Sequence, residues 1–235
     1  NADWSAVTVE LNPQNFDGVP PIPIVDSINQ KFDSRFGSTF TTETYTSRPI
    51  GEASSTRRVV VAIAAGSDHT SEVTVTGVTI GGVTSTIHVQ NTNFSSNKSC
   101  VTAIASAVVP TGTTATVAVT FSGATKGCTV WTVPLDKGSS ISAVQTLGVD
   151  ASSGSIARQP GDYVLAVGCA ADAQSNYPWM YDGADKIGDT YDHNGAKVMM
   201  MAGQRFDPAK GESELIQYNW YGAASRPSLA AVTFR

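Results

Sequence analysis

The residue types that most often carry out chemistry are few in this chain and lie far apart. Its 235 residues include three histidines, His69, His88 and His193, and no two of them form the HExxH pattern of a zinc protease. The sequence has no GxSxG elbow, phosphate-binding loop or dinucleotide-binding glycine pattern. Acidic residues are plentiful, but no two suggest the facing carboxylate pair of a glycosidase. We expect a protein that is not an enzyme and holds no cofactor or metal.

Polar and aromatic side chains are most concentrated in YPWMYDGADKIGDTYDHNG, residues 177–195. Aromatic rings can stack on the apolar faces of sugars, while carboxylates and carboxamides hydrogen bond with sugar hydroxyls. The predicted glycan-binding residues are Trp179, Tyr181, Asp185, Asp189, Tyr191, Asp192, His193 and Asn194.

Two other interpretations apply to parts of this stretch. In the internal repeat described below, Trp179 and Tyr181 align with apolar strand positions, which favours core packing for these two. Residues 191–194 have no apolar counterpart and are the better glycan candidates. Four aspartates could instead gather calcium, but their spacing is not that of an EF-hand loop, so we expect a solvated acidic loop. They are Asp182, Asp185, Asp189 and Asp192.

Composition and charge argue against several classes of function. The formal net charge is −5, and no basic cluster is larger than Arg57–Arg58, so nucleic-acid binding is not expected. No apolar run is long enough to span a bilayer, and the chain does not open on a signal-peptide pattern. The three cysteines, Cys100, Cys128 and Cys169, lack the short spacings of a zinc site, and their odd number argues against a disulfide framework. We expect buried, reduced thiols, as in a protein made in a reducing cytosol.

Short strands predominate between residues 57 and 134. In VTSTIHVQ, residues 83–90, apolar and polar residues alternate, which predicts one buried and one wet face and places His88 on the wet face. VVVAIAA, residues 59–65, does not alternate and predicts a central strand covered on both sides. Gly81-Gly82 predicts a two-residue hairpin, Gly77 a bulge, and PTGTT at residues 110–114 another hairpin.

The second half repeats this order of strands and turns about a hundred residues later. VVAIAAGSD at residues 60–68 aligns with VLAVGCAAD at residues 164–172, and VTAIASAVVP with MMMAGQRFDP. The predicted fold is an all-β, jelly-roll or immunoglobulin-like antiparallel sandwich, residues 38–235, built from repeats at 38–136 and 139–235. The short KGSS connection favours one body over two tandem domains.

Residues 1–37 read as a separate N-terminal arm. An alternating stretch around Trp4 is followed by a proline-rich extended segment and then by apolar residues at helical spacing, with Gly37 as a stop. The arm either folds back over the sandwich or lies along a neighbouring subunit and locks an oligomer. The residues expected to carry assembly are Trp4, Val25, Ile28, Phe32 and Phe36.

The phrases VTIGGVTST and VPTGTTATVAVTFSG, followed by a second half that ends SLAAVTFR, resemble a β-sandwich module of structural proteins in tailed phages, prophages and gene-transfer-agent-like particles. The resemblance covers about five-sixths of the chain and leaves out the arm. It implies a virion component made in the host cytoplasm: a head spike or fibre, a decoration protein or a tail-fibre part. Its implied partners are copies of itself, other virion proteins and bacterial surface glycans.

Three hypotheses follow. The first is a structural virion protein displayed for host attachment, and the second is a carbohydrate-binding module for bacterial polysaccharide. The third, which the lack of a catalytic motif disfavours, is an enzyme that degrades polysaccharide.

Overall fold

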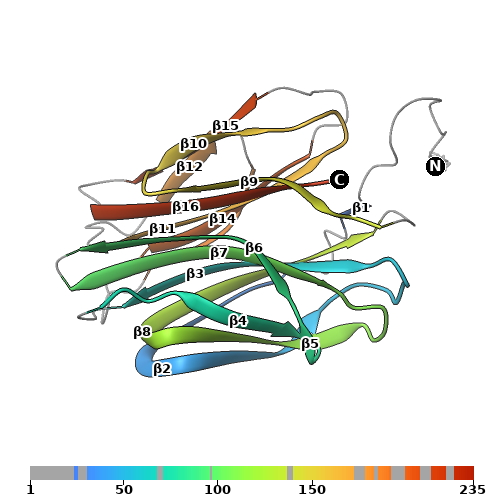
Figure 1. The fold of residues 1–235 in the computed structure, drawn as a ribbon, viewed down its shortest axis with the longest axis horizontal. Helices are drawn as coiled ribbons and strands as arrows, with labels where there is room; N and C mark the ends of the chain where they lie inside the picture. Colours follow the sequence, from blue (N-terminus) through green and yellow to red (C-terminus); the bar gives the residue numbers. More distant parts are fainter. Residues whose placement is uncertain are drawn as a thin grey trace, which may run out of the picture.

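A computed structural model describes the backbone of residues 24–25, 31–67, 71–95, 97–136, 140–171, 178–182, 185–191, 199–206, 213–220 and 225–235. Side chains are described within residues 39–66, 71–95, 97–136, 140–170 and 227–235. The described chain is all-β, and its antiparallel sheets form a sandwich-like, nearly closed barrel (Figure 1). No helix in the described residues is long and apolar enough to cross a membrane.

The strands of the first half are β1 (Ile24–Val25), β2 (Lys31–Pro49), β3 (Arg58–Ser67), β4 (Val75–Ile80), β5 (Val83–Thr84), β6 (Thr86–Ser95), β7 (Lys98–Val108) and β8 (Thr114–Asp136). Those of the second half are β9 (Ala143–Val149), β10 (Ser153–Ala157), β11 (Tyr163–Ala171), β12 (Pro178–Asp182), β13 (Asp185–Tyr191), β14 (Met199–Phe206), β15 (Ser213–Trp220) and β16 (Ser225–Phe234).

The long strand β8 organises the first half. Its first part pairs with β4 and with the end of β2, and its second part pairs with β3 and with the start of β2. The sheet therefore has an inner layer in the order β2-β8-β3-β7-β6 and an outer layer in the order β2-β8-β4-β5. The second half has a five-stranded sheet, β13-β14-β11-β16-β9, and a three-stranded sheet, β10-β15-β12.

The order of strand pairing is the same in the two halves. In the second half, β11 pairs with β14 and β16, as β3 pairs with β7 and the second part of β8 in the first half. Strand β9 pairs with β16 as the start of β2 pairs with the second part of β8. Strand β10 pairs with β15 as the end of β2 pairs with the first part of β8. The residues that the repeat aligns nevertheless face different cores: Val60 belongs to the core that the two halves share, whereas Val164 belongs to a core inside the second half. Each half thus presents one sheet, containing β3 or β11, to the other half.

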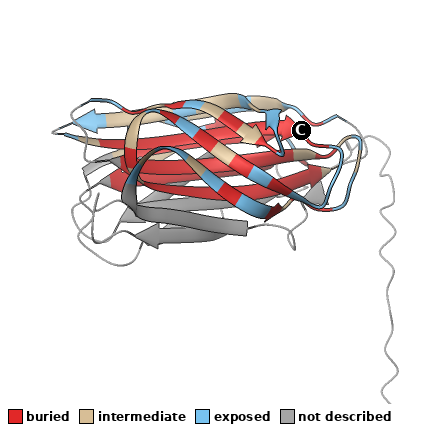
Figure 2. Ribbon diagram, turned by 90° about the horizontal axis from the view of Figure 1, so that it is seen from below, coloured by how far each residue is buried: buried red, intermediate tan, exposed pale blue. Residues whose placement is uncertain are grey.

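Strand β3 is a central strand covered on both faces, as the sequence predicts. In Figure 2 the buried residues run along the strands in the middle of the molecule. Its alternate residues enter two different cores, because successive side chains of a strand point to opposite faces. Val59, Val61 and Ile63 belong to the core inside the first half. Val60, Ala62 and Ala64 belong to a core shared with the second half, to which Tyr163, Leu165, Val167, Ala230, Val232 and Phe234 also contribute.

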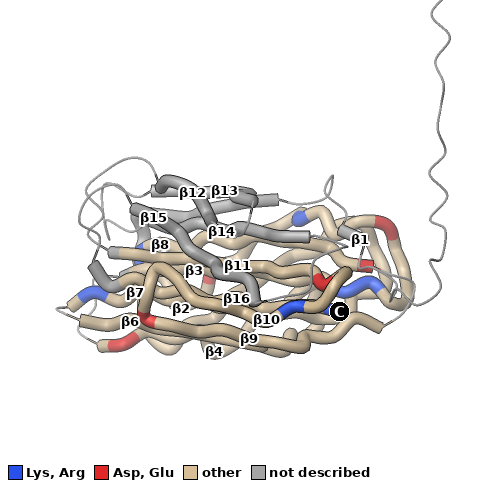
Figure 3. Tube along the Cα trace, turned by 90° about the horizontal axis from the view of Figure 1, so that it is seen from above, with Lys and Arg blue, Asp and Glu red and all other residues tan. Residues whose placement is uncertain are grey.

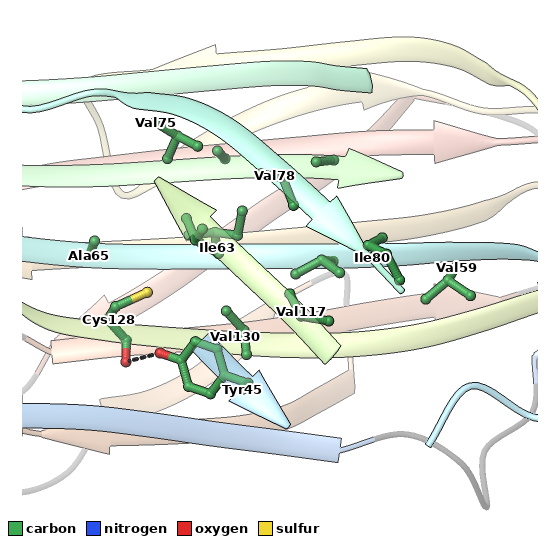
Figure 4. Packing of buried hydrophobic residues seen from close by; sticks show 14 of the residues in the cluster. Tyr45, Val59, Ile63, Ala65, Val75, Val78, Ile80, Val117, Cys128 and Val130 are labelled. Atoms are coloured by element: carbon green, nitrogen blue, oxygen red, sulfur yellow. Dashed lines mark hydrogen bonds between the residues drawn. The ribbon is translucent and has the colours of Figure 1, made fainter. Parts of the chain in front are cut away.

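The core inside the first half is shown in Figure 4. Tyr45 is fully buried there, and its hydroxyl donates a 2.8 Å hydrogen bond to the carbonyl oxygen of Cys128. Cys100, Cys128 and Cys169 are all free and buried, which confirms the prediction for the cysteines. Burial raises the pKa of the Cys128 thiol to about 12. These thiols therefore act as small apolar side chains.

Two of the predicted turns and bulges are confirmed. Gly81 and Gly82 have φ of 60° and 80° and join Ile80 to its partner Val83, as a tight hairpin requires. The pairing of β4 with β8 shifts its register between Val75 and Gly77, where the bulge was expected.

The hairpin predicted at PTGTT is wrong. A turn is present, with Gly112 at a φ of 74°, but the flanking strands β7 and β8 are separated by β3 in the inner layer. The turn instead carries the chain from the inner layer to the outer layer. Turn residues indicate a change of direction but do not decide which strands pair.

The helix predicted before Gly37 is wrong from Lys31 onward. Residues 31–36 begin β2 and pair with residues 127–132 of β8. The four-residue spacing of Phe32 and Phe36 fits one face of a helix, but four is also an even number and so fits one face of a strand. Of the other residues assigned to the arm, Val25 lies in β1 opposite Leu135, while Trp4 and Ile28 lie outside the described residues.

Candidate functional site

Arginines gather at one end of the molecule. This is the end where β3 and β11 begin and where β8 and β16 finish, and Figure 3 shows blue segments beside the C-terminus there. By strand register, the arginines whose side chains are described all lie at this end: Arg48, Arg57, Arg58, Arg158 and Arg235. Their surroundings differ, and so do the roles they can have.

Arg57 ties two loops together. It is 1% exposed, and its three guanidinium nitrogens donate to five backbone carbonyls at 2.6–2.9 Å. Two of the carbonyls lie in the loop before β3 and three in the turn between β7 and β8: Gly51, Glu52, Val109, Thr111 and Gly112. All three guanidinium nitrogens of Arg57 donate to backbone carbonyls, so its role is structural.

Arg58 and His88 meet where the two halves touch. Arg58 Nη1 donates to Ser106 Oγ at 2.8 Å, and Ser106 Oγ lies 2.7 Å from His88 Nε2. Because the Ser106 oxygen already accepts from Arg58, its own proton can be directed at Nε2 of a neutral His88. Burial, and next the charge of Arg58, lower the pKa of His88. Ser106 is only 1% exposed, so a substrate could not reach its hydroxyl. Ser106 and His88 therefore do not act as a nucleophile and its general base.

The prediction that His88 faces solvent is wrong. His88 is half-buried, and its ring meets the Phe234 ring edge-on, with centroids 5.6 Å apart. The polar face of β6 is covered in part by β16 of the second half, which the alternation within one strand could not reveal. Arg58 also reaches the second half, since its Nε donates to the Ile141 carbonyl at 2.6 Å.

Arg235 is fixed by an ion pair with a buried carboxylate. Its Nε and Nη2 donate to the two oxygens of Asp162 at 2.7 and 2.8 Å, and Asp162 is 0% exposed. Asp162 also accepts from the Gln159 backbone N–H at 2.7 Å. The Arg235 backbone pairs in both directions with Ser142. The guanidinium is therefore held from one side, and this ion pair raises its pKa.

A pocket of about 270 Å³ lies beside this ion pair and is the candidate functional site. Arg235 and Arg158 line it, together with Gln145 from β9 and Gln159 from the loop after β10. Val144 and Ala157 complete the lining. The Arg235 guanidinium and the side chains of Gln145 and Gln159 are accessible groups of this lining, and they can hydrogen bond with an oxygen-rich ligand.

The predicted glycan residues are divided between two sheets. Strand β12 carries Trp179 and Tyr181 and pairs with β15, where Trp179 is opposite Asn219. Strand β13 carries Asp185, Asp189 and Tyr191 at an edge of the five-stranded sheet. Only the backbone of these strands is described, and Asp192, His193 and Asn194 lie outside the described residues. Their role in glycan binding stays a prediction.

The sequence did not identify the pocket. Its lining comes from three places in the chain: β9, the end of β10 with the loop that follows it, and the residue after β16. Arginine and glutamine form no motif at these spacings, so no sequence signal indicated them. Among the described residues, no group of three or more His, Cys, Asp or Glu side chains is placed to hold a metal ion.

Comparison with known proteins gave no match to a family model, a curated protein or a solved structure.

Proposed function

We propose that this chain is a non-enzymatic structural protein of a phage or phage-like particle, displayed on the surface for attachment to the host. A head spike or fibre, a decoration protein and a tail-fibre component all fit this proposal. The phrases VTIGGVTST and VPTGTTATVAVTFSG suggest it, since they resemble those of such virion proteins.

The observation that carries the proposal is the apolar core between the two halves, in which Val60, Leu165 and Phe234 are fully buried. It joins the two halves in one tightly packed body, and a part that projects from a particle has to be stiff. The matching pairing order of the halves supports the further proposal that they are two copies of one jelly-roll or immunoglobulin-like unit.

Assembly through the N-terminal residues is the part of the proposal that can be tested directly. The full chain and a chain starting at Pro23 would be compared by light scattering, since that truncation leaves β1 and β2 intact. We expect a defined oligomer for the full chain and a folded monomer for the shorter one. Circular dichroism would verify that both are folded. The same number of subunits in both particles would contradict assembly through this segment.

A carbohydrate-binding module is the second candidate, and the pocket beside Arg235 favours it. The carboxamides of Gln145 and Gln159 at that pocket are suited to sugar hydroxyls. The two functions are compatible, because a displayed virion protein can also bind a surface glycan. Loss of glycan affinity in a folded Tyr191→Ala or Asp192→Ala variant would place binding at the loop predicted from the sequence instead.

A further inference from the structure

We infer that the pocket beside Arg235 binds a neutral sugar through adjacent hydroxyl groups of its ring. This inference rests on the carbohydrate-binding candidate of the proposed function and names its class of ligand. The volume of about 270 Å³ lies at the small end of ligand pockets, which suits a single sugar unit. The inference is independent of how the protein assembles.

The first argument is that neither arginine of the pocket is a free charge. Asp162 is fully buried behind Arg235 and forms an ion pair with it, so the charge of Arg235 is balanced. Arg158 is 4% exposed and is engaged in an interaction of its own. An ion that entered the pocket would lose water of hydration without gaining an unpaired counter-charge, whereas a neutral ligand avoids that cost. The charges therefore favour a neutral ligand.

The second argument is the mixture of donors and acceptors in the lining. Within the described chain, the carboxamides of Gln145 and Gln159 make no hydrogen bond, and both side chains are exposed. Nη1 of Arg235 makes no hydrogen bond there either, and this side chain is 33% exposed. A carboxamide donates and accepts, as a hydroxyl does, while a guanidinium only donates. Adjacent ring hydroxyls can use both kinds of group, and Val144 and Ala157 offer apolar surface to the C–H groups.

The third argument is that buried polar contacts hold the lining in place. Both oxygens of Asp162 accept from Arg235, and one of them also accepts from the Gln159 backbone N–H. The fully buried Thr233 donates from its hydroxyl to the Ala157 carbonyl at 3.1 Å, which ties the end of β10 to β16. A lining that is fixed before binding loses little conformational entropy when the ligand arrives.

The test uses the full chain labelled with ¹⁵N and titrated with methyl glycosides of glucose, galactose and mannose. The matching uronates carry a carboxylate in place of the hydroxymethyl group, tetrahydropyran has the ring without hydroxyls, and N-methylacetamide represents a peptide group. The signals to follow are the side-chain amides of Gln145 and Gln159. We expect at least one neutral glycoside to shift both amides and to bind at least fivefold more tightly than its uronate. Neither tetrahydropyran nor N-methylacetamide should shift them.

Truncated side chains give the matched control. Gln145→Ala combined with Gln159→Ala removes both carboxamides from exposed positions and should weaken the sugar at least tenfold, followed at the Arg235 backbone amide. Thr116→Ala, at an exposed position of the outer layer, should leave binding unchanged. Well-dispersed spectra would verify that both variants are folded.

Three results would overturn the inference: no shift of the two side-chain amides with any neutral glycoside, a uronate or N-methylacetamide that binds as tightly as the sugar, or equal effects of the two variants. Signals that shift only elsewhere in the chain would also overturn it, while leaving carbohydrate binding at another site intact. None of these results bears on oligomer assembly.

Discussion

At the scale of single residues, Arg57 makes the clearest contribution to stability. Replacing it by methionine would leave five backbone carbonyls without their charged donor, while retaining an apolar side chain of similar length. Leaving a buried backbone acceptor without its donor costs about 1–3 kcal/mol. Because several acceptors are affected, we expect Arg57→Met to lower the free energy of unfolding by roughly 3 kcal/mol in urea titrations.

Arg57→Lys is the control for the charge itself. Lysine keeps the positive charge but has three donors on one nitrogen, so it cannot reach both loops with the geometry of the guanidinium fork. The loss in free energy of unfolding should therefore be smaller for Arg57→Lys than for Arg57→Met. A methionine variant within about 1 kcal/mol of the natural protein would show that water satisfies these carbonyls.

His88 should make stability depend on pH. Its pKa in the folded chain lies below its usual value of about 6.5, because of burial and the charge of Arg58. Between the folded pKa and about 6.5, the unfolded chain binds more protons than the folded chain, so stability falls as the pH is lowered through that range. Melting temperatures at pH 7.5 and 5.5 should differ less in His88→Gln than in the natural protein. Equal differences would show that His88 does not contribute.

At the scale of elements, period-two alternation and paired glycines predicted much of the strand pattern. The stretch that does not alternate, residues 59–65, is the strand buried on both faces, and Gly81-Gly82 forms the predicted hairpin between β4 and β5. The wrong predictions have a common cause: the structure of each segment depends on a strand that lies far away in the sequence. Phe32 and Phe36 are in a strand because β8 is there to pair, and PTGTT joins two layers because β3 separates its neighbours. The pocket was missed for the same reason.

Strand β2 allows a test of this conclusion. Deleting residues 1–23 leaves every described strand intact, whereas deleting residues 1–37 removes β1 and the part of β2 that pairs with residues 127–132. We expect the shorter deletion to leave the melting temperature of the fold nearly unchanged and the longer one to lower it clearly. Equal melting temperatures would show that the start of β2 adds no stability.

At the scale of the whole molecule, the core between the halves should make the protein unfold as one unit. Leu165 lies in the second half but packs in the core that it shares with β3. We expect one calorimetric transition, which Leu165→Ala shifts as a whole with a loss of about 2–5 kcal/mol. A matched change, Ile63→Ala, in the core inside the first half should shift the same transition. Two transitions, each sensitive to one variant only, would contradict this expectation.

The first and last strands, β1 and β16, bring both termini of the described fold to the same end of the molecule. Ile24 in β1 is opposite Asp136, and Arg235 pairs with Ser142, so both lie at the end where the arginines gather. The hairpin between β6 and β7 and the turn after β9 lie at the opposite end, where Asn91 donates to Asp150 at 2.8 Å. If the protein is anchored through residues next to either of these strands, that opposite end becomes the outermost tip. A peptide epitope grafted between Ser95 and Lys98 would then be presented farthest from the anchor.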